Sequence, residues 1–384
     1  MNAFAGTSSV WEKESFFRKR DVLIIGAGLS GLWSAYYLKK MNPSLSVAIV
    51  ERGMIPTGAS TRNAGFACFG SVTELMKDRK TMGDADMVKL VSMRYAGIRR
   101  IMQTFNPAEI DFTLCGGYEL ITKDHDTDLN KEIRSLNTLL ADAVETSSTF
   151  TMQDGKICNF GFNSVKHLVQ NDLEGFLHPG KLCEQLLKLV QSLGVTILNG
   201  IHVDGYTKTG TGFELTTAQR VELKADRLLI CTNAFASQLL PRADVGPARG
   251  QILLTSEIPG LKFKGAFHAD EGFYYFRNLG NRVLLGGARN IDMDAENSPR
   301  LEITDNIQNA LESFLSRFIL PGTSYEITDR WSGIMGMGSE KMPLTAEIEP
   351  GVFYAVRMSG MGVALTPIVG EKVALMMSGK PTKY

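Results

Sequence analysis

The feature that most constrains the fold is a glycine-rich turn between a strand and a helix near the N-terminus. Residues 22–25 (Val-Leu-Ile-Ile) form an unbroken apolar run, which is typical of a strand buried on both faces. The turn Gly26-Ala27-Gly28-Leu29-Ser30-Gly31 follows directly, and apolar residues then recur at helical spacing from Ser30 to Lys40. A second apolar strand, 47–50, ends at Glu51, so we expect one βαβ unit of about 30 residues.

The spacing of this turn predicts a dinucleotide-binding site. Gly26 permits the tight bend, Gly28 lets the backbone approach a pyrophosphate, and Gly31 lets helix and strand pack closely. The helix N-terminus offers N–H donors and positive potential to the phosphates. Glu51 can accept hydrogen bonds from the adenosine ribose and would repel a 2′-phosphate, which disfavours NADP. A glycine-rich turn that binds nothing is the alternative.

A second loop of small and amide-bearing residues follows soon after Glu51. It runs from Thr57 to Gly65 and is suited to holding the rest of a long dinucleotide. FAD needs such additional contacts because its flavin must be held rigidly, so the loop favours FAD over NAD. The residues expected at the cofactor in these two segments are Gly26, Ala27, Gly28, Leu29, Ser30, Gly31, Glu51, Arg52, Gly58, Ala59, Ser60, Thr61, Arg62, Asn63, Ala64 and Gly65.

Composition excludes several classes of protein. The chain has 384 residues with 41 basic and 41 acidic side chains, and this zero balance argues against a nucleic-acid binder. Its five cysteines are scattered without a C-x-x-C pair, which indicates a reducing compartment and no metal site. No apolar run approaches the roughly 18 residues of a membrane span, and residues 1–20 lack the apolar stretch of a signal peptide. We expect a cytoplasmic protein without a membrane span.

Three further segments, together with the N-terminal turn, match the sequence pattern of one enzyme family over nearly the whole chain. They are Cys231-Thr232-Asn233-Ala234, Ala248-Arg249-Gly250-Gln251 and 359–367. With the N-terminal turn and Glu51-Arg52-Gly53, they resemble the D-amino-acid oxidase-like FAD oxidoreductases, the group that contains glycine and sarcosine oxidases. Loop 60–65 is most similar to γ-glutamylputrescine oxidase-like members. The resemblance adds these expected cofactor residues: Val203, Thr232, Asn233, Ala234, Gly360, Met361, Gly362, Val363 and Ala364.

The resemblance implies a mixed α/β fold, with a Rossmann-like FAD-binding domain interleaved with an antiparallel-sheet substrate domain. In such enzymes a hydride passes from a substrate carbon, usually an amine carbon, to flavin N5, while the protein positions and desolvates the substrate. We therefore expect a FAD-dependent amine oxidase or dehydrogenase that oxidises a C–N bond of a small amine or N-substituted amino acid. The expected FAD-binding domain is discontinuous, comprising 1–82, 160–240 and 326–384, and the expected substrate domain comprises 83–159 and 241–325.

The sequence departs from the family pattern where the substrate is expected. Ile334 and Gly360 stand where amino-acid-oxidising members carry arginines that grip the substrate carboxylate. Because both arginines are absent, an amine with a distant carboxylate, or with none, fits better than a plain α-amino acid. Two alternatives stay open: FAD-dependent oxidation of a 2-hydroxy acid, and a flavin-binding protein without turnover.

The residues also bear on how FAD is held and reoxidised. The loop where some relatives carry a flavin-attaching histidine reads Arg62-Asn63, so we expect non-covalent FAD. The strand at 284–287 lacks the lysine that helps oxygen react in sarcosine-oxidase-like members. The expected partners are therefore a small-molecule amine substrate and an electron acceptor that is either oxygen or another molecule.

Four residues are candidates near the substrate: Tyr118, Tyr275, Arg277 and Met361. Tyr118 follows a Gly-Gly turn and could reach into the pocket together with its neighbour Glu119, and Met361 occupies a loop position that lies beside the flavin in relatives. Strand alternation directs Tyr275 and Arg277 to one face and Tyr274 to the other, and one of the two sets is expected to pack in the core. The catalytic residue itself is unknown, because the flavin carries the chemistry.

The last helix of the chain is expected to begin at Thr366, as its N-cap, with Pro367 as its first residue. Gly379 is expected to close it. On this expectation the residues from Gly360 to Ala364 form a loop before the helix.

Overall fold

The computed structural model describes residues 8–123 and 128–382, which form two compact units interleaved along the chain. The first unit comprises Met1–Thr61, Gly180–Ala248 and Met335–Tyr384, and the second comprises Arg62–Pro179 and Arg249–Ile334. Each unit has its own sheet, one with a parallel centre and one largely antiparallel, which confirms the mixed α/β fold. The bounds of the units differ from the expected domain bounds at four segments: 62–82, 160–179 and 326–334 lie in the second unit, and 241–248 lies in the first.

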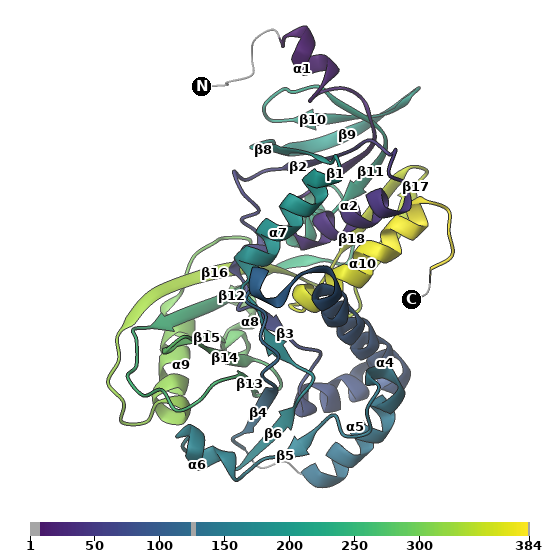
Figure 1. The fold of residues 1–384 in the computed structure, drawn as a ribbon. Helices are drawn as coiled ribbons and strands as arrows, with labels where there is room; N and C mark the ends of the chain where they lie inside the picture. The colour runs from purple at the N-terminus through teal and green to yellow at the C-terminus, as the bar shows by residue number, and fades with distance from the viewer. Residues whose placement is uncertain (1–7, 124–127, 383–384) are drawn as a thin grey trace. The chain divides into compact units, whose positions relative to one another are not determined.

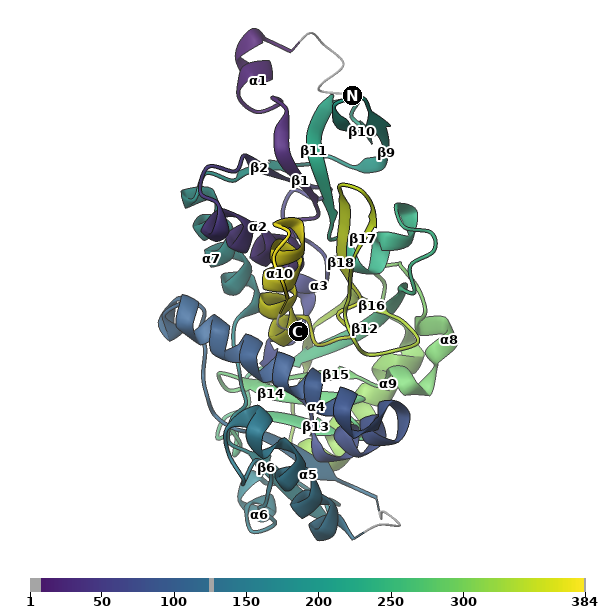
Figure 2. The same cartoon turned by 90° about the vertical axis from the view of Figure 1, so that its right-hand side faces the viewer.

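The first unit contains an eight-stranded sheet and the helices that cover it (Figures 1 and 2). Its elements are α1 (Val10–Glu14), β1 (Arg20–Ile25), α2 (Leu29–Met41), β2 (Val47–Glu51), α3 (Ala59–Arg62), α7 (Pro179–Ser192), β8 (Thr196–Asn199), β9 (Val203–Thr209), β10 (Gly212–Thr217), β11 (Leu223–Ile230), η2 (Asn233–Gln238), β17 (Leu344–Glu349), β18 (Val352–Val356) and α10 (Gly362–Met377). The strand order is β17-β18-β11-β1-β2-β8, and β9 and β10 form an antiparallel ribbon beside β11.

The central strands of this sheet are apolar because both of their faces are buried. Residues 22–25 of β1 are at most 4% exposed, as expected of a central parallel strand. Helices α2 and α10 lie side by side (Figures 1 and 2). Gly370 permits this close approach, since a Cβ there would lie 2.8 Å from the Ser34 backbone nitrogen.

The second unit contains the other eight-stranded sheet and a short two-stranded ribbon of β3 and β7. Its elements are β3 (Phe66–Ala67), α4 (Val72–Thr104), η1 (Pro107–Glu109), β4 (Gly117–Ile121), α5 (Leu129–Val144), β5 (Thr151–Met152), α6 (Lys156–Phe160), β6 (His167–Asn171), β7 (Gly175–Phe176), β12 (Gly246–Thr255), β13 (Ala266–Ala269), β14 (Tyr274–Leu279), β15 (Arg282–Gly287), η3 (Arg289–Ile291), α8 (Met293–Glu296), α9 (Asp305–Phe314), η4 (Leu315–Ile319) and β16 (Ile327–Met337). Within this unit, α4 packs beside α5 (Figure 1), and residues 72–82, which were expected in the other domain, are part of α4.

The sheet of the second unit runs β16-β12-β15-β14-β13-β4-β6-β5. The β12–β15, β15–β14, β14–β13, β4–β6 and β6–β5 ladders are antiparallel, whereas β13 and β4 are parallel. One face packs against α9 in an aromatic and aliphatic core that includes Phe267 and Phe276. The opposite face carries the polar side chains described below.

No helix in residues 8–123 and 128–382 is long and apolar enough to cross a membrane. Over the same residues, no three His, Cys, Asp or Glu side chains are grouped so that they could hold a metal ion.

Candidate active site

The predicted cofactor residues of the first unit lie mostly at the carboxyl ends of neighbouring parallel strands. Ile25 at the end of β1 lies beside Val50 of β2 and Ile230 of β11, and β11 in turn pairs with β18. The chain passes from β1 to β2 on one side, whereas β11 lies on the other side. Ligands of open α/β sheets bind outside the strand ends at such a reversal of strand order.

The glycine turn has the close approaches that its sequence predicts. Gly26 adopts a φ of 107°, and a Cβ there would lie 2.9 Å from the carbonyl oxygen of Cys231. A Cβ at Gly31 would lie 2.0 Å from the carbonyl oxygen of Gly26, so only glycine fits where α2 meets the turn. At Gly28 a Cβ would meet only the Ser60 hydroxyl, at 3.0 Å, which leaves the backbone open to a ligand.

Glu51 holds the turn and keeps acceptor capacity for a ligand. Its Oε2 accepts from the backbone N–H of Ala27 at 2.9 Å, and its Oε1 accepts from that of Gly53 at 2.8 Å. An ionised carboxylate has about four acceptor positions, so two remain for ribose hydroxyl groups. The neighbouring Arg52 guanidinium lies 4.4 Å from the centre of the Phe235 ring.

The second predicted loop is divided between the two units. In the first unit, Ser60 Oγ accepts from the backbone N–H of Leu29 at 2.9 Å, so the loop carrying Gly58, Ala59 and Thr61 reaches the start of α2. The rest of the loop, Arg62, Asn63, Ala64 and Gly65, belongs to the second unit. There the Trp331 indole donates to the Arg62 carbonyl at 3.0 Å, and the Gly65 N–H donates to the Asn63 side chain at 2.8 Å.

The turns after β11 and β18 contain one side chain that holds the backbone and two hydroxyl groups that lack a hydrogen-bond partner. Asn233 Oδ1 accepts from the backbone N–H groups of Arg357 and Met358 at 3.0 and 3.3 Å, so this side chain holds the turn after β18. In contrast, Thr232 Oγ1 and Ser359 Oγ are buried and have no hydrogen-bond partner among the described residues. Buried hydroxyls are normally paired, so these two fit a site that a bound polar group completes.

The last helix begins earlier than the sequence predicts. It starts at Gly362, and Thr366 lies inside it, where its hydroxyl donates to the Gly362 carbonyl at 2.7 Å. The predicted N-cap at Thr366 is therefore wrong, because this hydroxyl bonds back along an existing helical turn. Met361 is the N-cap residue, and Gly360 precedes it with a φ of 81°. The predicted cofactor residues 362–364 thus supply the unpaired N–H groups of a helix start.

Several predicted cofactor residues offer only their backbone to a ligand, because their side chains lie in the core. These are Ala27, Leu29, Val203, Ala234, Val363 and Ala364. Taken together, two helix starts, a glycine turn that a Cβ would fill, a ribose acceptor and two orphaned hydroxyls fit an FAD-type dinucleotide. Gly26 to Gly31 and residues 360–364 would hold its phosphates, and Glu51 its adenosine ribose.

In the second unit, β14 separates the candidate substrate residues into two faces. Tyr274 and Phe276 pack in the core, at 9% and 0% exposed, so Tyr275 and Arg277 point to the opposite face. Tyr118 lies on the core side, where its ring stacks on Phe267 with centres 5.1 Å apart. Tyr118 therefore packs in the core and does not face Tyr275 and Arg277, because alternation along β4 directs Glu119 to the polar face instead.

The polar face contains titratable groups, of which Tyr275 and Glu119 were candidates from the sequence and His268 was not. Glu119, His268 and Tyr275 are register partners across β4, β13 and β14 and share this face. Burial lowers the pKa of His268 to about 4 and raises that of Tyr275 to about 12, so both are neutral near pH 7. Phe66 of β3 lies edge-on to both rings, at 5.0 and 5.8 Å between centres. No local sequence signal marks His268, because its place in this row depends on the pairing of β13 with β4 and β14.

Two buried carboxyls hold the first turn of α4 and the segment before it. Glu119 accepts from the N–H of Thr73 at 3.0 Å, and Glu174 accepts from those of Phe69 and Gly70 at 2.7 and 3.2 Å. Both line a small cavity of this unit together with His268. Burial raises the pKa of Glu119 to about 7 and that of Glu174 to about 8.

Replacing Glu174 with glutamine should make stability less dependent on pH. The raised folded-state pKa stabilises the protein at low pH, and this contribution is lost as the pH rises from about 4.5 to about 8. The glutamine oxygen still accepts from the two backbone N–H groups but does not ionise. We expect E174Q to be more stable than the wild type by about 1–3 kcal/mol at high pH, with little difference at low pH. Urea denaturation across this range measures it, and parallel profiles would contradict it.

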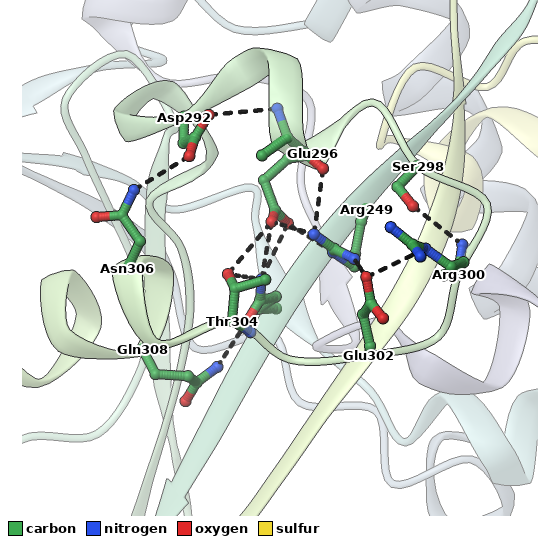
Figure 3. A network of polar contacts seen from close by, with 11 residues as sticks. Arg249, Asp292, Glu296, Ser298, Arg300, Glu302, Thr304, Asn306 and Gln308 are labelled. Atoms are coloured by element: carbon green, nitrogen blue, oxygen red, sulfur yellow. Dashed lines mark hydrogen bonds and ion pairs between the residues drawn. The ribbon is translucent and has the colours of Figure 1, made fainter.

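The segment Arg249-Gly250-Gln251 takes part in a buried network of polar contacts around Glu296 (Figure 3). Arg249 forms a two-pronged ion pair with Glu296, at 3.0 Å from Nε and 2.6 Å from Nη2, and the two side chains are 2% and 1% exposed. Gln251 Nε2 donates to both Glu296 oxygens at 3.0 Å and to Thr304 at 2.8 Å. This network joins the start of β12 to α8 and to the start of α9.

The parallel sheet, its glycine turn and the separate polar sheet define a dinucleotide-dependent oxidoreductase. The chain belongs to the DAO family of FAD-dependent oxidoreductases, whose family model matches residues 21–376. FAD is therefore its cofactor.

Individual relatives and solved structures are similar over nearly the whole chain. The probable oxidoreductase OrdL of Rhizobium meliloti is 25% identical over 376 residues, covering 95% of this chain and 85% of that protein. The γ-glutamylputrescine oxidoreductase of Escherichia coli is 22% identical over 386 residues, covering 95% and 85%. The crystal structure of glycine oxidase from Geobacillus kaustophilus has a TM-score of 0.78 at 19% identity, covering 95% of this chain and 96% of that one, and shows the shared fold.

Proposed function

We propose that the protein oxidises a C–N bond of a small amine or N-substituted amino acid, by hydride transfer to non-covalently bound FAD. The observation that carries the proposal is the family match over residues 21–376, which includes segments of both units. The similarity to γ-glutamylputrescine oxidoreductase and to glycine oxidase supports a nitrogen-bearing substrate. Bound FAD supplies the two-electron chemistry.

The side chains of the second unit suit a neutral amine. His268 and Tyr275 are uncharged near pH 7, since burial lowers the pKa of the first to about 4 and raises that of the second to about 12. A neutral phenol can donate a hydrogen bond and a neutral imidazole can accept one. We propose that these groups orient the substrate and exclude water, while its amine proton is lost before binding.

The absence of arginine at two positions argues against a plain α-amino acid. Ile334 is 2% exposed on β16, and Gly360 has a left-handed φ of 81°. Neither residue offers a charge to a substrate carboxylate. This supports an amine whose carboxylate is distant or absent.

Anaerobic reduction of the holoprotein by a substrate panel tests this function. Amines and N-methylated amino acids are expected to bleach the flavin absorption, whereas 2-hydroxy acids are not. Bleaching by hydroxy acids alone would favour the 2-hydroxy acid alternative, and no bleaching by any compound would favour a flavin-binding protein without turnover. Admitting oxygen afterwards then measures whether oxygen is the electron acceptor.

A further inference from the structure

We infer that Arg277 determines substrate specificity by binding a carboxylate that lies several bonds from the reacting amine. This inference rests on the proposed oxidation of an amine. It assigns a receptor for the distant carboxylate in the second unit, on the face of β14 opposite the core.

The main evidence for this inference is that the buried Arg277 guanidinium has no anionic partner. Arg277 is 4% exposed, and its Nε is buried with no hydrogen-bond partner. Across residues 8–123 and 128–382, its guanidinium makes no ion pair and no hydrogen bond. The other buried arginines of this unit differ, since Arg249 is paired with Glu296 and Arg94 with Glu74.

The charge of Arg277 persists despite its burial. Burial lowers its pKa to about 10, which still leaves the guanidinium protonated near pH 7. An uncompensated buried charge is strongly unfavourable, so a site of this kind is completed by an anion.

The surroundings of Arg277 do not provide that anion. Its guanidinium carbon lies 4.5 Å from the centre of the Phe176 ring, a cation–π contact that leaves the N–H groups unpaired. Cys115 is a neighbouring thiol whose pKa burial raises to about 11, so it is uncharged near pH 7. Asp111 attracts the Arg277 guanidinium electrostatically, but Asp111 is an exposed residue and forms no ion pair with it.

A second polar group on the same strand extends the receptor. Tyr275 lies two residues before Arg277, hence about 7 Å away along the same face. A Cβ at Gly286 would lie 2.8 Å from the Tyr275 hydroxyl, so the glycine makes room for this ring. A hydroxyl and a guanidinium at this spacing suit an elongated polar substrate better than a single compact headgroup.

The positive charge of Arg277 also determines how the substrate is oriented. A guanidinium repels a nearby ammonium group and attracts a carboxylate, most strongly through paired N–H donors. A substrate with both groups therefore places its carboxylate at Arg277 and its amine several bonds away. This ordering fits ω-amino acids and related N-substituted acids.

The test compares matched ligands on the FAD-loaded protein. Pentanoate and pentanamide have similar shapes and no oxidisable amine, so their binding is measured by flavin absorption and by the rise in melting temperature. We expect the wild-type protein to bind pentanoate at least about 10-fold more tightly than pentanamide. Hydrogen bonds to charged groups contribute enough binding free energy for a difference of this size. R277M should weaken pentanoate binding about 10- to 100-fold and leave pentanamide unchanged, and R277K should lie between.

The matched control is R317M. Arg317 also lies over an aromatic ring, with its guanidinium carbon 4.9 Å from the centre of Phe318, but it is exposed. This variant should bind both ligands as the wild type does. A wild-type protein without preference for pentanoate, an R277M variant that keeps the preference, or equal binding of inorganic phosphate would overturn the inference. If R277M does not fold, the comparison of pentanoate with pentanamide on the wild-type protein still tests the inference.

A second arm separates this inference from the proposed function. Reduction of the flavin by 5-aminopentanoate should exceed reduction by pentylamine at equal concentration, and R277M should abolish the difference. If no amine bleaches the flavin, the proposed function fails, while the pentanoate measurement still decides whether Arg277 binds carboxylates.

Discussion

Replacing Arg249 with alanine is expected to lower the free energy of unfolding by about 3–5 kcal/mol, because a buried carboxylate then remains without its partner. Glu296 is 1% exposed, and its two oxygens receive the Arg249 guanidinium at 2.6 and 3.0 Å. Gln251 still donates to this carboxylate in the variant, but a neutral amide does not neutralise it. The urea midpoint of the holoprotein, followed by circular dichroism and tryptophan fluorescence, measures the loss.

Two control variants show whether burial of the ion pair causes this effect. Arg99 and Glu145 form a pair whose side chains are 44% and 67% exposed, so R99A should cost at most about 1 kcal/mol. The double variant R249M/E296L removes both buried charges and should recover much of the stability lost in R249A. Equal losses in R249A and R99A would show that the network of Figure 3 contributes no more than a surface pair.

Sequence alone predicted the nucleotide-binding part of the fold because its signals are local. The apolar run of β1, the glycine turn and Glu51 lie within about 30 consecutive residues, and each glycine meets a steric demand of its nearest neighbours. The observed α2, Leu29–Met41, differs by one residue at each end from the helix expected over 30–40. The start of α10 was missed because a Thr-Pro pair is a strong cap signal even where the helix continues through it.

Sequence predicted less about the second unit, because its site depends on contacts between distant segments. Alternation along β14 separated Tyr275 from Tyr274 but did not show which face is the core. That depends on α9, which packs on the side of Tyr274. The pairing of Tyr118 with Phe267 depends on the parallel β4–β13 ladder, which joins segments about 150 residues apart.

The burial of two carboxyls could not be predicted for the same reason. Glu119 and Glu174 are isolated acidic residues in the sequence, and nothing near them indicates burial. Their environment comes from the first turn of α4 and the segment before it, whose backbone N–H groups donate hydrogen bonds to the two carboxyls. A raised pKa is thus a property of tertiary structure and not of the local sequence.

Gly31→Ala is expected to raise the dissociation constant of FAD about 100-fold, because the added methyl group has no space. A Cβ at this position would lie 2.0 Å from the Gly26 carbonyl oxygen and 3.3 Å from Ile24 Cγ2. The backbone oxygen cannot move without opening the turn, and overpacking of this kind costs about 1–3 kcal/mol. The start of α2 would then move away from the end of β1, where its N–H groups are proposed to meet the phosphates.

The matched control for this variant is Gly205→Ala in β9, where a Cβ would meet no atom within 4 Å. Flavin content after gel filtration and titration of apoprotein with FAD, followed by fluorescence quenching, measure both variants. G205A should bind FAD as the wild type does, whereas G31A should lose its yellow colour while circular dichroism still reports a folded chain. A G31A protein with wild-type FAD affinity would mean that the close contact between helix and turn is not what shapes the phosphate site. The FAD-binding role of the turn would then depend on Gly26 and Gly28, which meet different neighbours.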